Sequence, residues 1–205
     1  MTQSPQRWIA AGFFLVSAAL SPQRAGAQEA TINLMNSRGQ VAGHATLVQE
    51  PGSVRLRVDV TGLAPGAHGI HIHAMGKCEP PSFDSAGPHF NLDGKHHGLD
   101  NPAGPHAGDF PNLIVGPDGS VQASFLDSRV TLGPGSHSLF PAGGTSLVIH
   151  ADPDDERTDP AGNSGPRIAC GVIARYDLRT DGGAGSASRF LPKASQSHSG
   201  GPGSC

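Results

Sequence analysis

The chain has 205 residues, of which 29 are glycine and 18 are proline. Glycine forfeits backbone entropy in a helix and proline lacks an N–H donor, so this composition excludes a helical bundle or a coiled coil. The formal charge of −3 argues against a nucleic-acid-binding protein, which needs a basic surface, while 11 histidines beside one Trp and one Tyr point to metal binding.

The first 27 residues have the pattern of a secretory signal peptide. Arg7 supplies a positive start, residues 8–20 form an apolar run, and Ala25-Gly26-Ala27 is a small-x-small cleavage site. The run is too short to cross roughly 30 Å of hydrocarbon as a helix, and a buried N-terminal helix or strand is the weaker alternative. We therefore expect cleavage near Ala27 and export of a mature chain without a membrane span.

The three cysteines would then lie in an oxidising compartment, where disulfides persist. Cys78 and Cys170 lie in sequence of ordered character, whereas Cys205 ends a Ser/Gly-rich segment. The economical pairing is Cys78 with Cys170, which closes a loop of about 90 residues and is worth roughly 4–5 kcal/mol on the chain-entropy account. Cys205 is then left as a free thiol; the alternative is that Cys205 pairs with one of the other two.

Several short segments alternate apolar and polar residues with the period of a β-strand. In the clearest, 54–60, four apolar side chains face one side and three charged ones face the other. Residues 113–115, a turn at 116–119 and residues 121–126 predict a hairpin. Further strands are expected at 31–35, 41–48, 69–73, 145–150 and 168–176. Many short strands with Gly/Pro turns and no helical periodicity predict an all-β sandwich or barrel in one domain.

Three segments interrupt the strand pattern. Residues 76–111 and 152–166 are rich in Pro, Gly and Asp without sustained alternation, and connections of that length are usually functional or disordered. Residues 181–205 are Gly/Ser-rich, which is typical of a flexible extension. The predicted organisation is therefore a signal peptide at 1–27, one domain at 28–180 and a tail at 181–205.

Histidines gather in and around the first long loop. In a strand, His71 and His73 project from one face and can grip one metal ion. The further candidate ligands are His89, His96, His97, His106, Asp109 and His150. A long ordered loop must offset an entropy cost of roughly 1–2 kcal/mol per residue, which a metal ion and a disulfide can do. Three His with one Asp suit tetrahedral zinc and four imidazoles suit copper, so two sites are filled if one histidine is shared.

Seven short strings carry a resemblance to a known family. They are GIHIH at 69–73, GKC at 76–78, GPHFN at 87–91, GPHAGD at 104–109, VIH at 148–150, GNSG at 162–165 and RIACGVI at 167–173. In order and spacing, residues 30–177 resemble the copper/zinc superoxide dismutases of the bacterial exported type. The resemblance implies a flattened Greek-key β-barrel of eight strands with long metal-binding and electrostatic loops.

The resemblance also implies a complete metal centre with one copper and one zinc ion per subunit. The implied copper ligands are His71, His73, His89 and His150, and the implied zinc ligands are His89, His97, His106 and Asp109, with His89 shared. Asp154 matches the carboxylate that connects a copper-ligand histidine to a zinc-ligand histidine. Arg167 matches the arginine beside the copper, and Cys78 and Cys170 match the family's disulfide.

Two adjacent histidines compete for one of these zinc positions. In the family, the shared histidine and the next zinc ligand are usually eight residues apart, and that ligand and the third are nine apart. This spacing selects His97 and leaves His96 as an exposed neighbour. His68 matches a position that hydrogen-bonds the backbone. The remaining histidines, His44, His137 and His198, are interpreted as surface residues.

The implied activity is dismutation of superoxide to O₂ and H₂O₂ by a copper centre that alternates between Cu(II) and Cu(I) (a superoxide:superoxide oxidoreductase). His89 and Arg167 would take part in catalysis, as proton carrier and as fixed positive charge for the anion. The expected compartment is the periplasm, with secretion as the alternative, and no nucleic-acid partner is expected. The family contains monomers and homodimers, so both stay open. The competing function is non-catalytic copper/zinc binding or delivery on the same fold; a zinc hydrolase is disfavoured because the sequence has no HExxH string.

Overall fold

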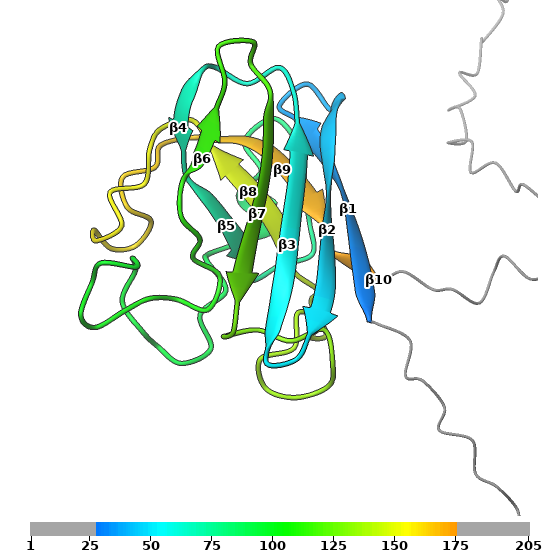
Figure 1. The fold of residues 1–205 in the computed structure, drawn as a ribbon, viewed down its shortest axis with the longest axis vertical. Helices are drawn as coiled ribbons and strands as arrows, with labels where there is room; N and C mark the ends of the chain where they lie inside the picture. Colours follow the sequence, from blue (N-terminus) through cyan, green and yellow to red (C-terminus); the bar gives the residue numbers. More distant parts are fainter. Residues whose placement is uncertain (1–27, 176–205) are drawn as a thin grey trace, which may run out of the picture.

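A computed structural model describes residues 28–175 (Figure 1). The predicted signal peptide at 1–27, the end of the predicted domain at 176–180 and the whole predicted tail at 181–205, with His198 and Cys205, lie outside the described residues. Within 28–175, no helix is long and apolar enough to cross a membrane.

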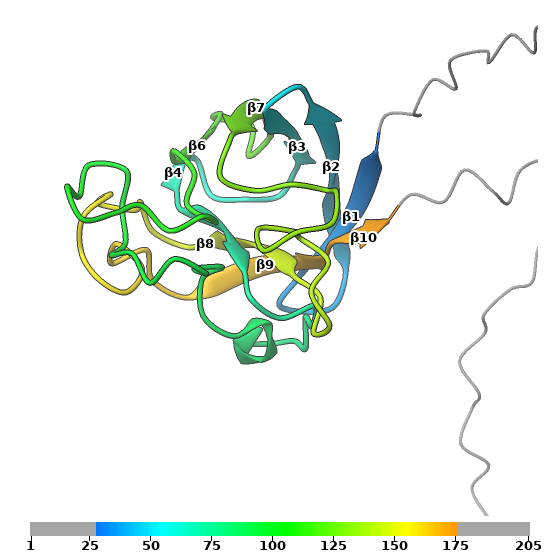
Figure 2. The same cartoon turned by 90° about the horizontal axis from the view of Figure 1, so that it is seen from below.

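The described residues form ten strands and one short 3₁₀ helix. The elements are β1 (Glu29–Asn36), β2 (Val41–Glu50), β3 (Ser53–Val60), β4 (Gly66–His68), β5 (Ile70–His73), η1 (Asp84–Ala86), β6 (Leu113–Val115), β7 (Val121–Asp127), β8 (Ser146–His150), β9 (Arg167–Val172) and β10 (Ala174–Arg175). Eight strands make one curled antiparallel sheet in the order β5-β8-β9-β1-β2-β3-β7, with β10 on β1, and β4 pairs with β6. Seen from below, the strands curl around a central core (Figure 2), which confirms the all-β barrel.

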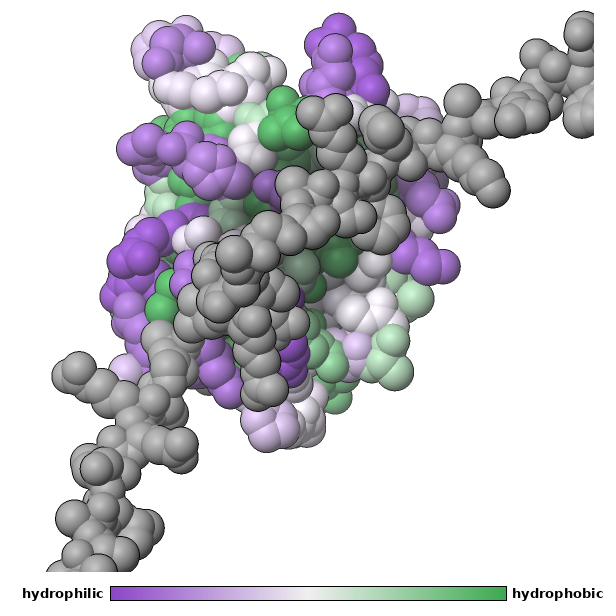
Figure 3. All heavy atoms as spheres, turned by 90° about the vertical axis from the view of Figure 1, so that its right-hand side faces the viewer, coloured by the Kyte–Doolittle hydropathy of each residue, from purple (hydrophilic) through white to green (hydrophobic). Residues whose placement is uncertain are grey.

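The alternating apolar and polar residues of the sequence lie on the inner and outer faces of the sheet, respectively. In β3, Val54, Leu56, Val58 and Val60 are buried, while the residues between them are partly or fully exposed. Successive side chains of a strand point to opposite faces, so every second residue reaches the core. On the side that carries β1 and β10, apolar and polar side chains intermingle over the visible surface (Figure 3).

The predicted hairpin over 113–126 is wrong in its pairing. The turn forms, with Gly119 in the left-handed region at φ 75°. However, β6 pairs with β4, and β7 pairs with β3 over seven residue pairs. The seven-pair ladder with β3 outweighs what the three residues of β6 could offer to β7. The predicted strand at 69–73 is observed as β5 from residue 70, and Gly69 separates it from β4. The predicted strand at 168–176 is interrupted at Ile173, which divides it into β9 and β10.

The first long loop is attached to the barrel by two phenylalanines. Phe90 and Phe110 are buried in the main core, one residue after His89 and Asp109 respectively. Two backbone hydrogen bonds hold the loop against β5: the N–H of Phe90 donates to the carbonyl oxygen of Ile72 (2.8 Å), and the N–H of Ile72 donates to that of Gly108 (2.9 Å). The apolar side chains thus face the core, and the neighbouring ligand-type side chains face away from it.

The disulfide fixes the start of the same loop. Cys78 is bonded to Cys170 of β9, with a sequence separation of 92 and a Cα–Cα distance of 5.6 Å. Phe83 and Ala86 pack with Cys170 and Val148 in a second, smaller core beneath this segment. The economical pairing predicted from the sequence is therefore confirmed.

Candidate metal centre

Six histidines and one aspartate converge outside strand β5. His71 and His73 come from β5 and His150 ends β8, the strand paired with it. All four residues of β5 are buried, because Ile70 and Ile72 lie in the main core and the loop covers the other face. The loop adds the other four side chains, His89, His97, His106 and Asp109, all buried as well.

Four of these histidines form a compact group. The ligand-type nitrogens of His71, His73, His89 and His150 all lie within 4.8 Å of one another. These are the four residues predicted as copper ligands. His71 and His89 stack with ring centroids 4.0 Å apart.

Hydrogen bonds fix which nitrogen of each ring is free. The Nδ1–H of His73 donates to the carbonyl oxygen of Gly87 (2.8 Å), and the Nδ1–H of His150 donates to that of Gly165 (3.1 Å). His71 uses its Nε2–H on the carboxylate of Asp154 (2.6 Å). The opposite nitrogens, His71 Nδ1, His73 Nε2 and His150 Nε2, are buried without a hydrogen-bond partner among the described residues, as is His89 Nε2. Buried lone pairs of this kind fit a metal ion that ties them together.

Burial keeps these rings in the neutral form that binds metal. It lowers the pKa of His71 to about 3 and that of His150 to about 4, and it lowers the pKa of His73 well below its ordinary value. Repulsion from neighbouring histidines acts in the same direction. The four nitrogens are therefore available as lone-pair donors at neutral pH.

The second group surrounds one carboxylate oxygen of Asp109. Asp109 Oδ1 lies 3.1 Å from His89 Nδ1, 3.2 Å from His97 Nδ1 and 3.4 Å from His106 Nδ1. The atoms of His71, His89, His97 and Asp109 also lie within 4.8 Å of one another; His106 is outside that set, although its Nδ1 is 3.4 Å from His89 Nδ1. Both His71 and His89 belong to the two sets, and His89 is the residue that the resemblance implies as the shared ligand. Three imidazoles and one carboxylate fit zinc.

His97, and not His96, lies in this group. The ring of His97 is fully buried, whereas the side chain of His96 is 61% exposed and pairs with Asp159 outside the cluster. The two differ because the backbone N–H of His97 donates to the other carboxylate oxygen of Asp159 (2.6 Å) and so turns the His97 ring inward.

Asp154 connects the two groups. Its Oδ2 accepts from His71 Nε2 and, at 2.9 Å, from His97 Nε2. Asn112 holds the backbone of Asp154 in place, accepting from its N–H (2.7 Å) and donating to its carbonyl oxygen (2.8 Å). Gly162, at φ 60°, packs against both Asp154 and the His97 ring, where a Cβ would collide with them. The sequence resemblance pointed to Asp154, but nothing in the sequence singled out Asn112.

Arg167 lies at the edge of an open cleft that reaches the first group. His73, His89, His150, Pro160 and Ala161 are among the residues that line this cleft of about 630 Å³, and Arg167 is the permanently charged side chain in its lining. The guanidinium donates to the carbonyl oxygens of Phe83 and Gly87, both at 2.7 Å. Burial lowers the pKa of Arg167, but an arginine remains charged under working conditions.

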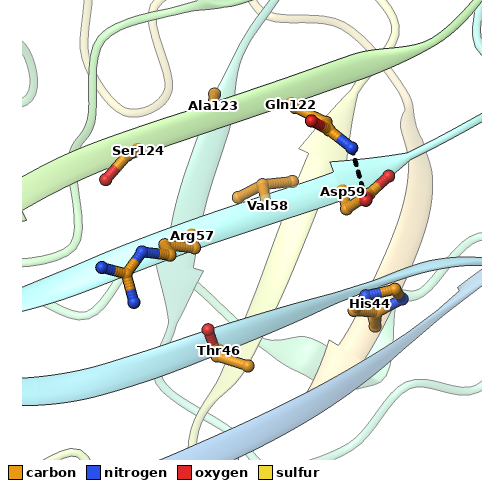
Figure 4. Close-up of a pocket in the computed structure, with 8 residues that line it drawn as sticks. All are labelled: His44, Thr46, Arg57, Val58, Asp59, Gln122, Ala123 and Ser124. Atoms are coloured by element: carbon orange, nitrogen blue, oxygen red, sulfur yellow. Dashed lines mark hydrogen bonds between the residues drawn. The ribbon is translucent and has the colours of Figure 1, made fainter.

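The other described histidines, one buried and the rest at the surface, lie outside the cluster. His68 bonds the carbonyl oxygens of His150 and Ala64, both at 2.8 Å, which agrees with its predicted backbone role. His137 pairs with Asp93 at the surface. His44 lies in a shallow hollow on the outer face of β2, β3 and β7, where the drawn hydrogen bond joins Gln122 to Asp59 (Figure 4).

The pKa of His97 predicts how zinc competes with protons. Although burial opposes it, hydrogen bonds to Asp109 and Asp154 raise the pKa of His97 to about 10. Without metal, the ring therefore carries a proton on both nitrogens at pH 7, and a metal ion that binds at Nδ1 must displace one of them. Zinc binding should therefore release about one proton at pH 7, and its dissociation constant should fall about tenfold per pH unit between roughly pH 6 and 9.

Calorimetry in buffers of different ionisation enthalpy measures this proton release directly. His96→Gln is the matched control, since it changes the exposed neighbour and should leave the number unchanged. Zinc binding without proton release at pH 7 would contradict the prediction.

Comparisons with known proteins agree with this geometry. The family model described as copper/zinc superoxide dismutase (SODC) matches residues 41–173. "Superoxide dismutase [Cu-Zn] 2" of Aquifex aeolicus (strain VF5) is 47% identical over 167 residues, which is 80% of this chain and 95% of that protein. "Superoxide dismutase [Cu-Zn]" of Caulobacter vibrioides is 41% identical over 138 residues, or 66% of this chain and 79% of that protein.

Solved structures show the same likeness. A crystal structure of a superoxide-dismutase-like protein from Bacillus subtilis matches with a TM-score of 0.68 and 36% identity, covering 70% of this chain and 97% of that one. The copper/zinc superoxide dismutase from Brucella abortus matches with a TM-score of 0.58 and 27% identity, covering 71% of this chain and 99% of that one.

Proposed function

Because the chain belongs to the copper/zinc superoxide dismutase family, it is an enzyme that converts superoxide to O₂ and H₂O₂, and we propose that the two histidine groups are its copper and zinc sites. The copper ligands are His71, His73, His89 and His150, and the zinc ligands are His89, His97, His106 and Asp109. The observation that carries this assignment is the set of buried, unpartnered ring nitrogens that face one another in the first group.

When bound, copper supplies one-electron chemistry that oxidises one superoxide and reduces the next, and zinc supplies positive charge without redox chemistry. Arg167 attracts the anion into the cleft and offers it N–H donors beside the four histidines. The two carbonyl oxygens that accept from the guanidinium hold Arg167 in this position. His89 holds a proton at Nε2 between the two half-reactions and gives it to the reduced product, while its Nδ1 stays turned toward Asp109.

A non-catalytic copper or zinc carrier on the same fold is the competing function. It would be favoured by the loss of a copper-ligand histidine, and all four are present with a free nitrogen. Metal analysis of the mature protein should find one copper and one zinc per chain. Pulse radiolysis or competition with cytochrome c should find dismutation, and its absence with both metals bound would support the carrier instead.

Arg167→Ala is expected to lower the rate at low superoxide concentration about tenfold, which corresponds to roughly 1.4 kcal/mol in the transition state. The effect follows from the loss of the fixed positive charge beside the cleft, so copper content should be unchanged. Arg157→Ala is the matched control, because Arg157 is an exposed cation that pairs with Asp100 on the surface. Equal rates for Arg167→Ala and the wild type would remove Arg167 from the site.

We also propose that residues 1–27 are cleaved and that the mature enzyme acts outside the cytoplasm, with the periplasm as the first expectation and secretion as the second. The small-x-small string before residue 28 and the disulfide support export. The mass of the mature protein and cell fractionation test this, and a full-length protein in the cytosol would contradict it. Light scattering decides between a monomer and a homodimer.

A further inference from the structure

Arg129 joins the barrel to the zinc group from outside the metal-binding loop. It lies just beyond β7, at the start of the connection to β8. Its backbone N–H and its Nε–H donate to Asp127 Oδ1 at 2.9 and 2.8 Å. One of its two terminal nitrogens, Nη2, donates to the main-chain carbonyl oxygen of Asp109 at 2.6 Å. One guanidinium therefore connects the end of a core strand to a residue assigned as a zinc ligand.

The direction of the Asp109 carboxylate depends on how its backbone and its second oxygen are held. Oδ2 accepts from the backbone N–H groups of Gly98 (3.0 Å) and His106 (2.9 Å), which leaves Oδ1 facing His89 and His97. Both of those donors belong to the first long loop (76–111), the loop that we call the metal-binding loop. Arg129 provides a bond to Asp109 from a different part of the fold.

Asp127 makes the guanidinium rigid. Asp127 is 1% exposed, and burial raises the pKa of its carboxyl group although Arg129 acts against this. A planar guanidinium presents its donors in a fixed fork, so fixing Nε on Asp127 also fixes where the terminal nitrogen points. The bond to Asp109 is thus formed by a group that is already oriented.

We propose that Arg129 is a positioning residue for the zinc site: it holds the main chain of Asp109 so that Oδ1 points at the metal, and Asp127 orients the guanidinium for this task. The proposal rests on the assignment of Asp109 as a zinc ligand. Arg129 acts through Asp109 and does not contact the metal.

A second contact between the β7–β8 connection and the first long loop offers a matched control. His137 Nε2, from the β7–β8 connection, lies 3.1 Å from the carboxylate of Asp93 in the metal-binding loop. Both side chains are partly exposed, at 38% and 50%, and neither bonds to Asp109. His137→Gln therefore removes a contact between the segments without touching Asp109.

The experiment measures metal affinity and the spectrum of the site. Arg129→Met is combined with Asp127→Asn, so that no carboxylate is left buried without its partner. Cobalt(II) and zinc dissociation constants are measured by competition with a chelator, together with the visible spectrum of the cobalt form and the melting temperature of the metal-free protein. We expect 10- to 100-fold weaker binding and an altered cobalt spectrum for the double variant, and binding within twofold of wild type for His137→Gln.

Arg129→Lys covers the case in which the double variant does not fold. A single ammonium group cannot reproduce the fork between Asp127 and Asp109, so a loss of about tenfold in cobalt affinity is expected. Wild-type affinity and spectrum in either Arg129 variant would overturn the proposal, as would an equal loss in His137→Gln. If the wild-type chain itself fails to give a tetrahedral cobalt spectrum, the ligand assignment of Asp109 is what fails.

Discussion

Asp154→Asn is expected to weaken metal binding by up to about 100-fold, because this carboxylate orients a ring in each of the two groups. Both His71 and His97 donate an N–H to it, and both bonds direct the opposite nitrogen, Nδ1, toward the metal positions. An asparagine side chain has one oxygen acceptor and one NH₂ donor. Oδ2 lies near both rings, whereas Oδ1 lies near His97 Nε2 only, at 3.0 Å. An amide with its oxygen at Oδ2 therefore turns its NH₂ group against the N–H of His97, and one with its oxygen at Oδ1 turns its NH₂ group against the N–H of His71.

The identity of the weakened site reveals which way the new amide turns. If the amide oxygen stays with His71, the loss falls on zinc; if it stays with His97, the loss falls on copper. Dissociation constants for both metals, measured with chelators of known affinity, distinguish the two cases. Asp154→Ala removes the acceptor for both rings and should weaken both sites.

A neighbouring aspartate provides the control for this experiment. Asp155 caps its own loop by accepting from the backbone N–H groups of Arg157 and Thr158 and from Asn163, and it touches neither histidine. Asp155→Asn should leave both dissociation constants within about twofold of wild type. Wild-type affinity for both metals in Asp154→Ala would show that Asp154 does not orient the ligands.

The sequence predicted features that depend on local pattern and missed those that depend on distant contacts. The inward residues of β3 follow from period-two alternation. The pairing of β7 with β3, in place of the predicted hairpin with β6, does not follow from the local pattern, because the paired residues are more than 60 positions apart in the chain. Family spacing placed His97 correctly in the cluster. The hydrogen bond from the His97 backbone to Asp159, which orients His97, joins two loops that no local sequence pattern connects.

The same distinction separates the proposed ligands from the residues that hold them in place. His71, His73 and Asp109 belong to recognisable strings, because metal binding fixes both residue type and spacing. Arg129 and Asn112 act through backbone atoms of Asp109 and Asp154, to which they are brought by the fold. Nothing in their own neighbourhood distinguishes them from surface polar residues.

Removal of the disulfide by Cys78→Ser with Cys170→Ser is expected to lower the free energy of unfolding of the metal-free protein by roughly 4–5 kcal/mol. The bond closes a long loop, so its loss gives the unfolded chain many more conformations. The variant is made in a Cys205→Ser background so that no third thiol can exchange. Urea unfolding measures the change against Cys205→Ser alone, and a loss below about 1 kcal/mol would contradict the expectation.

The disulfide also bears on the copper group through the segment that it anchors. This segment leads to Gly87, whose carbonyl oxygen accepts from both His73 Nδ1 and the guanidinium of Arg167. If the segment detaches, His73 loses the bond that selects its free nitrogen and Arg167 loses the bond that holds it at the cleft. The protein with a reduced Cys78–Cys170 pair should therefore bind copper more weakly than the protein with the intact disulfide. The zinc affinity depends on His97 and Asp109, so it should change less. Equal losses for the two metals on reduction would show that the disulfide acts through overall stability alone.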